Sequence, residues 1–439
     1  MNFKRKSILY LFVLFMLVLS ACGSDDNKEG STSNGDGDAQ LSFVAYSNYE
    51  EPLNAVIEEF EADHPNISVE LELYPITDLT ETIEIKMGSK SEDVDLLFTD
   101  SPLTANYALK GYLEPLDDLI DSDVKELWDE TALEGVMYDD HLVAAPLNSS
   151  SQVLYINEDI FKEKDVDIPK ADERLTWEEL LDIADELTYD SNGDGQNDVF
   201  GFSFDQIDRA YQILALPDSL GAEMLSEDGL TSEGYTNSPE AVEALNFYSD
   251  LFNEDKVSPK IGAEESIDYF TSGKVAMFLG ANHNLPKLEG SDLNYSVTLH
   301  PYFEKGEPAT PTGAWNVGVS RYSQNKEAAA QFLEYLTTGE GAKTFFETGD
   351  TLPVTNDLLD YIETDESYDE LPNSVIRISA MESRETAVQR PQSPGYPEWE
   401  THMNRALSDI KNGDDPQETL DSLVKNIDRG LEKYKKYIE

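Results

Sequence analysis

The chain has 439 residues, of which 89 are Asp or Glu and 31 are Lys or Arg, so its formal net charge at pH 7 is −58. This charge repels nucleic acids, phosphate-rich ligands and anionic membrane surfaces, and the sequence holds no basic patch with interleaved aromatics to offset it, so we expect no nucleic-acid partner. The acidic residues are spread along the chain, which favours a role in solubility over dedicated cation binding, and a chain of this length predicts two or more domains.

The first residues predict an export signal. Three basic residues at positions 4–6 precede an apolar run, Ile8 to Leu19, of about a dozen residues, which is shorter than the roughly 20 that a membrane-spanning helix needs. Leu19-Ser20-Ala21-Cys22 ends the run, contains the chain's single cysteine and resembles the lipobox of bacterial lipoproteins. We therefore expect residues 1–21 to be removed and Cys22 to carry a lipid that anchors the protein on the outer face of the cell membrane. An ordinary secretory peptide with an incidental cysteine is the alternative.

Residues 22–40 predict a flexible tether between the lipid and the folded body. After Cys22 they are mainly Gly, Ser, Asn and Asp. They contain almost no apolar side chain whose burial could offset the entropy lost on ordering. The folded body is therefore expected to begin at Leu41.

From Leu41 the hydrophobic period alternates between that of strands and that of helices. The segments 41–46 and 67–73 have the pattern of strands, a helical pattern follows each of them, and 94–98 is a nearly continuous apolar run typical of a strand buried on both faces. This β-α-β-α-β order predicts a parallel sheet with right-handed crossovers, in which ligands bind where the strands end. The loops 47–52 and 99–103, which follow the first and third strands, are therefore candidate ligand loops.

The remainder of the chain continues as an α/β protein. Apolar periodicity predicts strands at 142–145, 153–156, 275–279 and 317–320, and its clearest helices are 177–187, 239–252, 326–336, 399–410 and 420–437. The sequence shows no internal repeat of the length that solenoids and propellers use, which argues against both architectures.

Several segments, taken in order, carry a family resemblance: Tyr46-Ser47-Asn48, Asp95 to Asp100, Ala145 to Asn148, Leu154 to Asn157, Gly273 to Met277, Gly313 to Gly318 and Arg390 to Trp399. They resemble the extracellular solute-binding proteins that deliver sugars to ATP-driven importers, the maltose-binding-protein-like group. None of the segments is specific alone. Their order and spacing, which extend over nearly the whole chain behind the export signal, carry the resemblance.

The resemblance implies a periplasmic-binding-protein-like fold of type II. Two α/β lobes, each with a mainly parallel sheet flanked by helices, are joined by a hinge that the chain crosses three times, and the ligand lies in the cleft between them. By analogy, lobe 1 comprises residues 41–147 and 283–338, and lobe 2 comprises residues 148–282 and 339–439. Closure on a sugar would deliver it to the permease subunits of the importer, and the binding protein would act as a monomer that requires no cofactor.

A neutral sugar offers hydroxyl groups and C–H faces, so its site needs carboxylates or amides beside aromatic rings. Asp100, at the end of the third strand, and Glu50 or Glu51, on the adjacent loop, are candidate acceptors of hydrogen bonds from sugar hydroxyls. The alternative role of Asp100 is a helix N-cap, and the alternative for the two glutamates is simple solvent exposure.

Later segments add further candidates through the resemblance. Trp315, in a Gly-Ala-Trp-Asn turn, stands where the family stacks a ring on sugar, with core packing as its alternative. Arg390 and Tyr396 belong to an Arg-Pro…Pro-x-Tyr-Pro pattern similar to that of the trehalose-, maltose- and sucrose-binding branch, which implies a disaccharide or short oligosaccharide. A surface salt bridge is the alternative for Arg390. Weaker candidates are Asn148, Tyr155 and Asn282, the last of which stands where some relatives carry a cleft tryptophan.

The segment 190–198 has the spacing of a calcium-binding loop. Oxygen ligands stand at its first, third, fifth and ninth places, a glycine stands at the sixth and Gln196 at the seventh, so the candidate set is Asp190, Asn192, Asp194, Gln196 and Asp198. The twelfth place is Gly201, where a bidentate Glu is expected, so a tight Asn-Gly and Asp-Gly turn without metal is the alternative. Any calcium here would order one loop of the second lobe and would not contact the ligand.

Two other functions remain open at this stage. An exported glycan-cleaving enzyme needs two carboxylates a few ångströms apart, and 89 acidic residues make such pairs uninformative. Other catalytic motifs, such as His-Glu-x-x-His, Gly-x-Ser-x-Gly and a phosphate-binding Gly-rich loop with Lys, do not occur in the sequence, so we expect no catalysis. A surface adhesin or sensor could use the same binding chemistry without transport, and a polyol could replace the sugar.

Overall fold

The computed structural model describes residues 38–349 and 351–435. The predicted export signal, Cys22 and most of the predicted tether lie outside these residues. The first strand, β1 (Ala39–Tyr46), begins before the predicted end of the tether, because Ala39 and Gln40 already pair with Ile67 and Ser68 in a parallel ladder. Backbone hydrogen bonding, which composition does not reveal, orders these two residues.

The first sheet has the strand order β2-β1-β3-β12-β6, with β2 (Ile67–Tyr74), β3 (Leu96–Asp100), β12 (Gly313–Val319) and β6 (Ala145–Ser150). β1 is parallel to β2 and β3, whereas β12 is antiparallel to both β3 and β6. β6 therefore runs in the same direction as β1, β2 and β3, and β12 is the reversed strand of this sheet.

The second sheet has the order β10-β7-β9-β8, with β10 (Tyr295–Thr298), β7 (Gln152–Asn157), β9 (Val275–Ala281) and β8 (Phe200–Phe204). β7 is antiparallel to β10 and β9, and β8 is parallel to β9. The prediction of mainly parallel sheets thus holds for the direction of most strands, with one reversed strand in each. Both reversed strands lie next to a crossing between the sheets: β7 follows β6 after Ser151, and β12 follows β11 (Thr310–Pro311) after Thr312.

Two short ribbons complete the strands. β11 pairs in parallel with β13 (Ala387–Val388), and β4 (Met137–Tyr138) pairs with β5 (His141–Leu142) in antiparallel fashion. The predicted strand at 142–145 is therefore divided between β5 and the start of β6. A third crossing follows α13 (Gly339–Thr348), where Leu352 forms an isolated bridge with Ser149 of β6.

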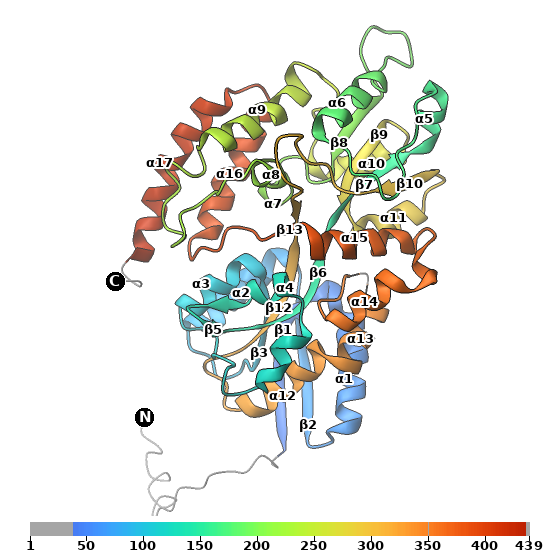
Figure 1. Cartoon of the computed structure of the whole chain (residues 1–439). Helices are drawn as coiled ribbons and strands as arrows, with labels where there is room; N and C mark the ends of the chain where they lie inside the picture. The colour runs from blue at the N-terminus through green and yellow to red at the C-terminus, as the bar shows by residue number, and fades with distance from the viewer. Residues whose placement is uncertain (1–37, 350, 436–439) are drawn as a thin grey trace, which may run out of the picture. The chain divides into compact units, whose positions relative to one another are not determined.

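The helices distribute their apolar faces between separate cores, and Figure 1 shows where the labelled helices lie around the strands. The core of the first sheet takes side chains from α1 (Glu50–Asp63), α2 (Ile76–Gly88), α3 (Ser101–Leu109), α4 (Glu130–Glu134), α12 (Lys326–Thr337) and α13. One core of the second sheet takes them from α5 (Glu158–Lys164), α6 (Trp177–Glu186), α7 (Ala210–Ile213), α8 (Ala215–Ser219), α9 (Pro239–Asn253), α16 (Tyr396–Lys411) and α17 (Pro416–Lys435).

The opposite face of the second sheet packs on α10 (Ala263–Thr271), α11 (Leu285–Glu289) and α15 (Asn373–Glu385), and α14 (Asn356–Thr364) packs on α15. Strand alternation along β7 produces the two faces, because Val153 and Tyr155 join this core whereas Leu154 and Ile156 join the other one. Short 3-10 turns lie at Ser47–Tyr49, Ser122–Leu127, Asn282–Asn284 and Glu366–Tyr368. Within the described residues, none of the helices has the length and apolar character that crossing a membrane requires.

Three elements lie elsewhere than the predicted lobe boundaries place them. β10 pairs with β7 in the second sheet and α11 packs on that sheet, although residues 283–338 are predicted for lobe 1. α13 packs on the first core, where the Phe345 ring stacks on that of Tyr49 at 5.7 Å, although residues 339–439 are predicted for lobe 2. All three errors concern segments that pair or pack over long sequence distances. The remaining boundaries stay predictions.

A buried carboxylate joins several segments beside the β11–β13 ribbon. Glu382 of α15 is fully buried, and it accepts hydrogen bonds from Arg174 Nη1 at 2.8 Å, the His300 backbone N at 2.7 Å and Thr310 Oγ1 at 3.0 Å, and also from Thr386 Oγ1. Thr310 belongs to β11, and Thr386 directly precedes β13. The carboxylate therefore holds both strands of the ribbon to α15, which Figure 1 shows beside the junction of the two sheets.

The neighbouring His300 makes stability depend on pH. Burial lowers the pKa of His300 from 6.5 to about 3, the Arg174 charge acts in the same direction, and the hydrogen bond from Nδ1 to the Pro301 carbonyl acts against them. As the pH falls below 6.5, His300 becomes protonated in the unfolded chain but stays neutral in the folded protein. The free energy of unfolding therefore falls until the pH reaches the pKa of His300 in the folded protein.

We expect the wild type to lose roughly 2 kcal/mol more unfolding free energy than His300→Gln between about pH 7.5 and about pH 5. The carboxylates that titrate in the same range are common to both proteins and cancel in the comparison. Urea unfolding at the two pH values measures the difference, and parallel pH profiles would contradict the assignment.

Candidate functional site

Three predicted ligand residues lie side by side at one edge of the first sheet. Asp100 is the last residue of β3, and Trp315 of β12 stands opposite it in the strand register. Asn148 of β6 stands opposite Trp315 on the other side, and its Oδ1 accepts a hydrogen bond from the Trp315 backbone N at 3.0 Å. Because β12 runs against β3 and β6, its beginning lies beside their ends. The strand pairing therefore gathers these residues although they are far apart in the chain.

An aromatic cluster extends from this edge. The Trp315 ring centroid lies 5.4 Å from that of Tyr46 and 5.6 Å from that of Phe98. Tyr49 packs on both Tyr46 and Phe98, and its hydroxyl accepts a hydrogen bond from Asn148 Nδ2 at 3.0 Å. Burial raises the pKa of Tyr49 to about 12, so this hydroxyl stays protonated. Trp315 and Tyr46 are partly exposed, so the cluster offers ring surface to a ligand.

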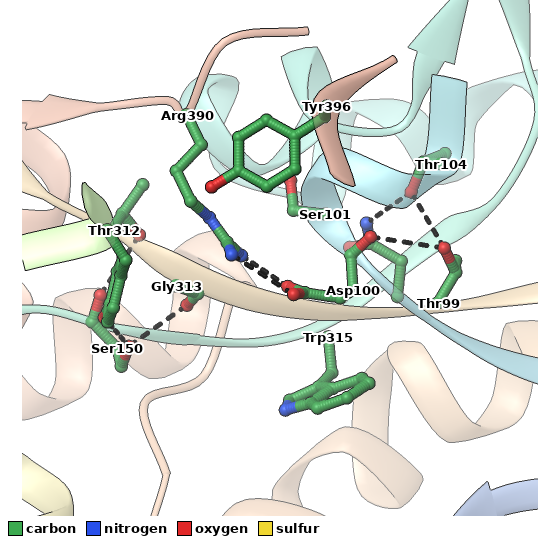
Figure 2. A network of polar contacts seen from close by, with 12 residues as sticks. Thr99, Asp100, Ser101, Thr104, Ser150, Thr312, Gly313, Trp315, Arg390 and Tyr396 are labelled. Carbon is green, nitrogen blue, oxygen red and sulfur yellow. Dashed lines mark hydrogen bonds and ion pairs between the residues drawn. The ribbon is translucent and has the colours of Figure 1, made fainter. Parts of the chain in front are cut away.

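Asp100 pairs with Arg390 through both oxygens, as Figure 2 shows. Arg390 Nη1 donates to Oδ2 at 3.1 Å, and Nη2 donates to Oδ1. The Arg390 side chain is 8% exposed, against 32% for Asp100, so the pair is not the surface salt bridge considered from the sequence. Asp100 does occupy the N-cap position of α3, but its side chain makes no capping hydrogen bond. The carboxylate is the accessible part of the pair.

Two tyrosine rings flank the guanidinium. Its carbon lies 5.2 Å from the ring centroid of Tyr211 and 5.9 Å from that of Tyr396. Tyr396 is buried and donates to Glu400 Oε1 at 2.9 Å, so it supports Arg390 and offers no surface to a ligand in this structure. Tyr211 is partly exposed, and a Cβ at Gly313 would come within 2.8 Å of its hydroxyl oxygen, which explains a glycine at this place in β12.

The charges of this region balance one another. Burial acts to lower the pKa of Arg390, but the charge of Asp100, the hydrogen bonds to Asp100 and the charge of Glu400 outweigh it, so the pKa rises and the guanidinium stays charged. Burial raises the pKa of Glu400, and the Arg390 charge partly offsets this rise. Arg390 is therefore bonded through two N–H groups to the Asp100 carboxylate and also feels the charge of Glu400.

The second sheet contributes a polar group that sequence reasoning missed. Asp205 directly follows β8, and its Oδ2 accepts from Asn284 Nδ2 at 3.0 Å and from Gln212 Nε2 at 3.3 Å. His283 Nε2 lies 3.1 Å from the same oxygen, and its side chain is 51% exposed. Because β8 and β9 are parallel, Asp205 and His283 both lie where strands end. The alternation Phe200-x-Phe202-x-Phe204 is the signal from which β8, and thus Asp205, could have been predicted.

The other sequence candidates fall in different places. Glu50 and Glu51 are exposed in the first turn of α1, where carboxylates favour the helix dipole. Asn282 is buried in the turn after β9. Tyr155 is fully buried, and its hydroxyl donates to the Ala281 carbonyl at 3.2 Å. The predicted ligand contact of Tyr155 is therefore wrong for this structure, because strand alternation points the ring into the core with Phe278.

The predicted calcium loop forms a turn built on its own carboxylates. Asp190 accepts hydrogen bonds from four backbone N–H groups, those of residues 192, 193, 194 and 195. Asp198 accepts from the backbone N and hydroxyl of Ser191 and from Asn192 Nδ2. In the described part of the chain, no group of three or more His, Cys, Asp or Glu side chains is placed to hold a metal ion. Calcium binding by Asp190, Asn192, Asp194, Gln196 and Asp198 stays a prediction.

The described geometry suits recognition of an uncharged polyhydroxyl compound. Ring surface at Trp315 and Tyr46 can pack on C–H groups, and the accessible carboxylate of Asp100 can accept hydrogen bonds from hydroxyls. The side-chain amide of Asn148 links the Tyr49 hydroxyl to the Trp315 backbone and so fixes the position of both residues. His283, half exposed beside the buried Asp205, offers a further polar group at the strand ends of the other sheet.

Comparison with known proteins defines the family. A protein-family model, described as bacterial extracellular solute-binding protein, matches residues 46–343 of this chain. The galactooligosaccharide-binding protein of Bacillus subtilis is 23% identical over 429 residues, which cover 95% of each chain. The sn-glycerol-3-phosphate-binding periplasmic protein of Salmonella paratyphi A is 26% identical over 319 residues, which cover 67% of this chain and 68% of the relative.

Among solved structures, the ABC substrate-binding protein of Listeria monocytogenes in complex with cycloalternan has a TM-score of 0.75 at 23% identity, and the match covers 90% of this chain and 99% of the other. The predicted two-lobe fold of type II is thereby confirmed. Since the family model covers more than half of the sequence, the chain belongs to the bacterial extracellular solute-binding proteins.

Proposed function

We propose that this protein captures a neutral sugar, a disaccharide or short oligosaccharide such as trehalose, maltose or sucrose, between its two lobes and delivers it to the permease of an ATP-driven importer. The observation that carries the proposal is the convergence of Trp315, Tyr46 and the accessible Asp100 carboxylate at one edge of the first sheet. A sugar needs this combination of ring surface and hydrogen-bond acceptors. The name of the Bacillus subtilis relative, a galactooligosaccharide-binding protein, agrees with this ligand class.

A phosphate ester, which the name of the Salmonella relative implies for that protein, suits this site poorly. Arg390 is the cation nearest to Trp315 and Asp100 in the contacts described above, and Asp100 already takes two of its N–H groups. An anionic ligand would have to displace that carboxylate while Glu400 and the net charge of −58 repel it. A neutral sugar can instead bind to the free side of Asp100 and leave the ion pair intact.

A thermal-shift screen tests the ligand class. Purified protein is heated with mono-, di- and oligosaccharides, polyols and sn-glycerol-3-phosphate, and a ligand at about 100 times its Kd should raise the unfolding free energy by roughly 2.7 kcal/mol. We expect a disaccharide or oligosaccharide to raise the Tm and sn-glycerol-3-phosphate to leave it unchanged. A rise in Tm with only the phosphate ester or only a polyol would reject the sugar assignment. An unchanged Tm with every compound would favour an adhesin or enzyme acting on longer glycans.

The same screen with and without a calcium chelator tests the 190–198 loop. If calcium orders this loop, the chelator should lower the Tm in the absence of sugar. An unchanged Tm would leave the loop as the carboxylate-capped turn of the structure.

We further propose that a lipid on Cys22 anchors the protein to the outer face of the cell membrane, on the basis of the Leu19-Ser20-Ala21-Cys22 sequence. Replacing Cys22 with serine removes the thiol that carries the lipid, so the protein should move from the membrane fraction to the medium. Immunoblots of fractionated cells measure this. Continued retention of Cys22→Ser in the membrane fraction would reject lipidation at this residue.

A further inference from the structure

A row of hydrogen bonds connects the first lobe to the segment 389–394. Ser101 Oγ donates to Gln389 Oε1 at 3.3 Å, and Gln389 Nε2 donates to the Thr131 carbonyl at 2.8 Å. Asn106 Nδ2 of α3 donates to the Pro394 carbonyl. The Asp100–Arg390 pair lies in the same row, next to Ser101 in Figure 2. The three contacts made by Ser101, Thr131 and Asn106 are called the clasp below.

The far side of the clasp is attached to the second lobe. Ser393 is fully buried, and its Oγ donates to the Gly229 carbonyl at 2.6 Å. Gly229 packs so closely on this segment that a Cβ there would lie 2.5 Å from the Gln392 carbonyl oxygen. Directly after the segment, Tyr396 and Trp399 of α16 enter the core that α9 and α17 share. Segment 389–394 therefore follows the second lobe in any movement, whereas α3 and α4 follow the first.

The clasp uses atoms that the proposed sugar contacts do not. Asn106 is 2% exposed, and its amide bonds to the backbone of the other lobe. Leu109 at the end of α3 packs against the second core, so an apolar contact continues the row of hydrogen bonds. Separation of the lobes about the hinge must break all these contacts and expose the Asn106 amide to water.

We infer that the clasp holds the two lobes together before any ligand is present and thereby sets the fraction of empty protein that is closed. Each neutral hydrogen bond contributes little net stability because water replaces it, so the clasp, together with the neighbouring Asp100–Arg390 pair, favours the closed state by a modest free energy. Sugar then needs to shift this equilibrium only slightly. Its apparent Kd depends on the clasp as well as on Trp315 and Asp100, a consequence that rests on the proposed function.

Spin-label distance measurements test the inference on ligand-free protein. In a Cys22→Ser background, which has no other cysteine, labels are placed by Glu58→Cys on α1 and Glu240→Cys on α9, both exposed. We expect a predominant short distance in the otherwise unchanged protein. Asn106→Ala with Gln389→Ala should lower the ratio of the short to the long population by about tenfold or more and raise the apparent Kd for sugar by the smaller factor by which the closed fraction falls. Gln389→Ala alone should have a smaller effect of the same sign.

Asn157→Ala is the matched control. Asn157 is also a buried asparagine, but its side chain caps α5 within the second lobe by accepting from the N–H groups of residues 159 and 160. Its loss should lower the Tm without changing the distance distribution. A long distance in the unchanged protein, an unaltered distribution in both clasp variants, or an equal shift in Asn157→Ala would overturn the inference. Absence of sugar binding would reject the proposed function only, because the distances are measured without ligand.

Discussion

Replacement of Trp315 by alanine should raise the Kd for the sugar more than tenfold, which corresponds to about 1.4 kcal/mol or more. The partly exposed ring lies against Tyr46 and Phe98 and stands opposite Asp100 in the strand register, so its removal takes away ring surface beside the carboxylate. Isothermal titration with the sugar found in the thermal-shift screen measures the change.

Two controls separate loss of a contact from loss of structure. Trp315→Phe keeps an aromatic face and should recover part of the affinity. Tyr361→Ala removes another aromatic side chain, which is 48% exposed on α14, and should leave the Kd unchanged. If Trp315→Ala is folded by circular dichroism and binds sugar as well as the wild type does, Trp315 does not contact the ligand.

Local patterns predicted those parts of the fold that depend on nearby residues. The helix expected at 177–187 is α6, whose start is fixed by a capping box in which Thr176 and Glu179 each bond the other's backbone N–H. The helices expected at 239–252 and 326–336 are α9 and α12, within a residue or so of their ends. In each case the apolar stripe and the cap lie within the segment itself.

The pairing of segments over long distances could not be predicted in the same way. Asp100 and Arg390 were both candidates for ligand contact, but nothing in the sequence indicates that they pair across 290 positions. Their ion pair requires β3 and the chain after β13 to meet, which depends on the hinge. The same dependence explains why β10, α11 and α13 fall outside the predicted lobe boundaries.

Burial was the other quantity that the sequence could not supply for single residues. Tyr155 and Trp315 both lie in motifs of the family and both are aromatic, yet one is fully buried and the other is partly exposed. The difference arises because β7 has a core on each face, whereas Trp315 stands near the beginning of β12, where the sheet ends. Only the packed structure distinguishes the two environments.

The largest loss of stability is expected for Glu382→Ala. The fully buried carboxylate pairs with Arg174, whose side chain is 15% exposed, and it also accepts from the His300 N–H and from Thr310. Its removal leaves a largely buried guanidinium and several donors without an acceptor, which costs about 3 kcal/mol or more. Urea unfolding should show this loss, whereas Glu385→Ala, an exposed residue on the same helix, should change the unfolding free energy by no more than about 0.5 kcal/mol.

A double variant distinguishes loss of a favourable pair from the cost of an unpaired charge. If the unpaired Arg174 causes most of the loss, Glu382→Leu with Arg174→Met should be more stable than Glu382→Leu alone, because apolar side chains replace both charges. Recovery should be incomplete, since the His300 N–H and the Thr310 hydroxyl still lack the carboxylate. If the double variant is no more stable than Glu382→Leu, the loss of unfolding free energy comes from these hydrogen bonds and not from the unpaired charge of Arg174. The main role of Glu382 would then be to attach the β11–β13 ribbon to α15.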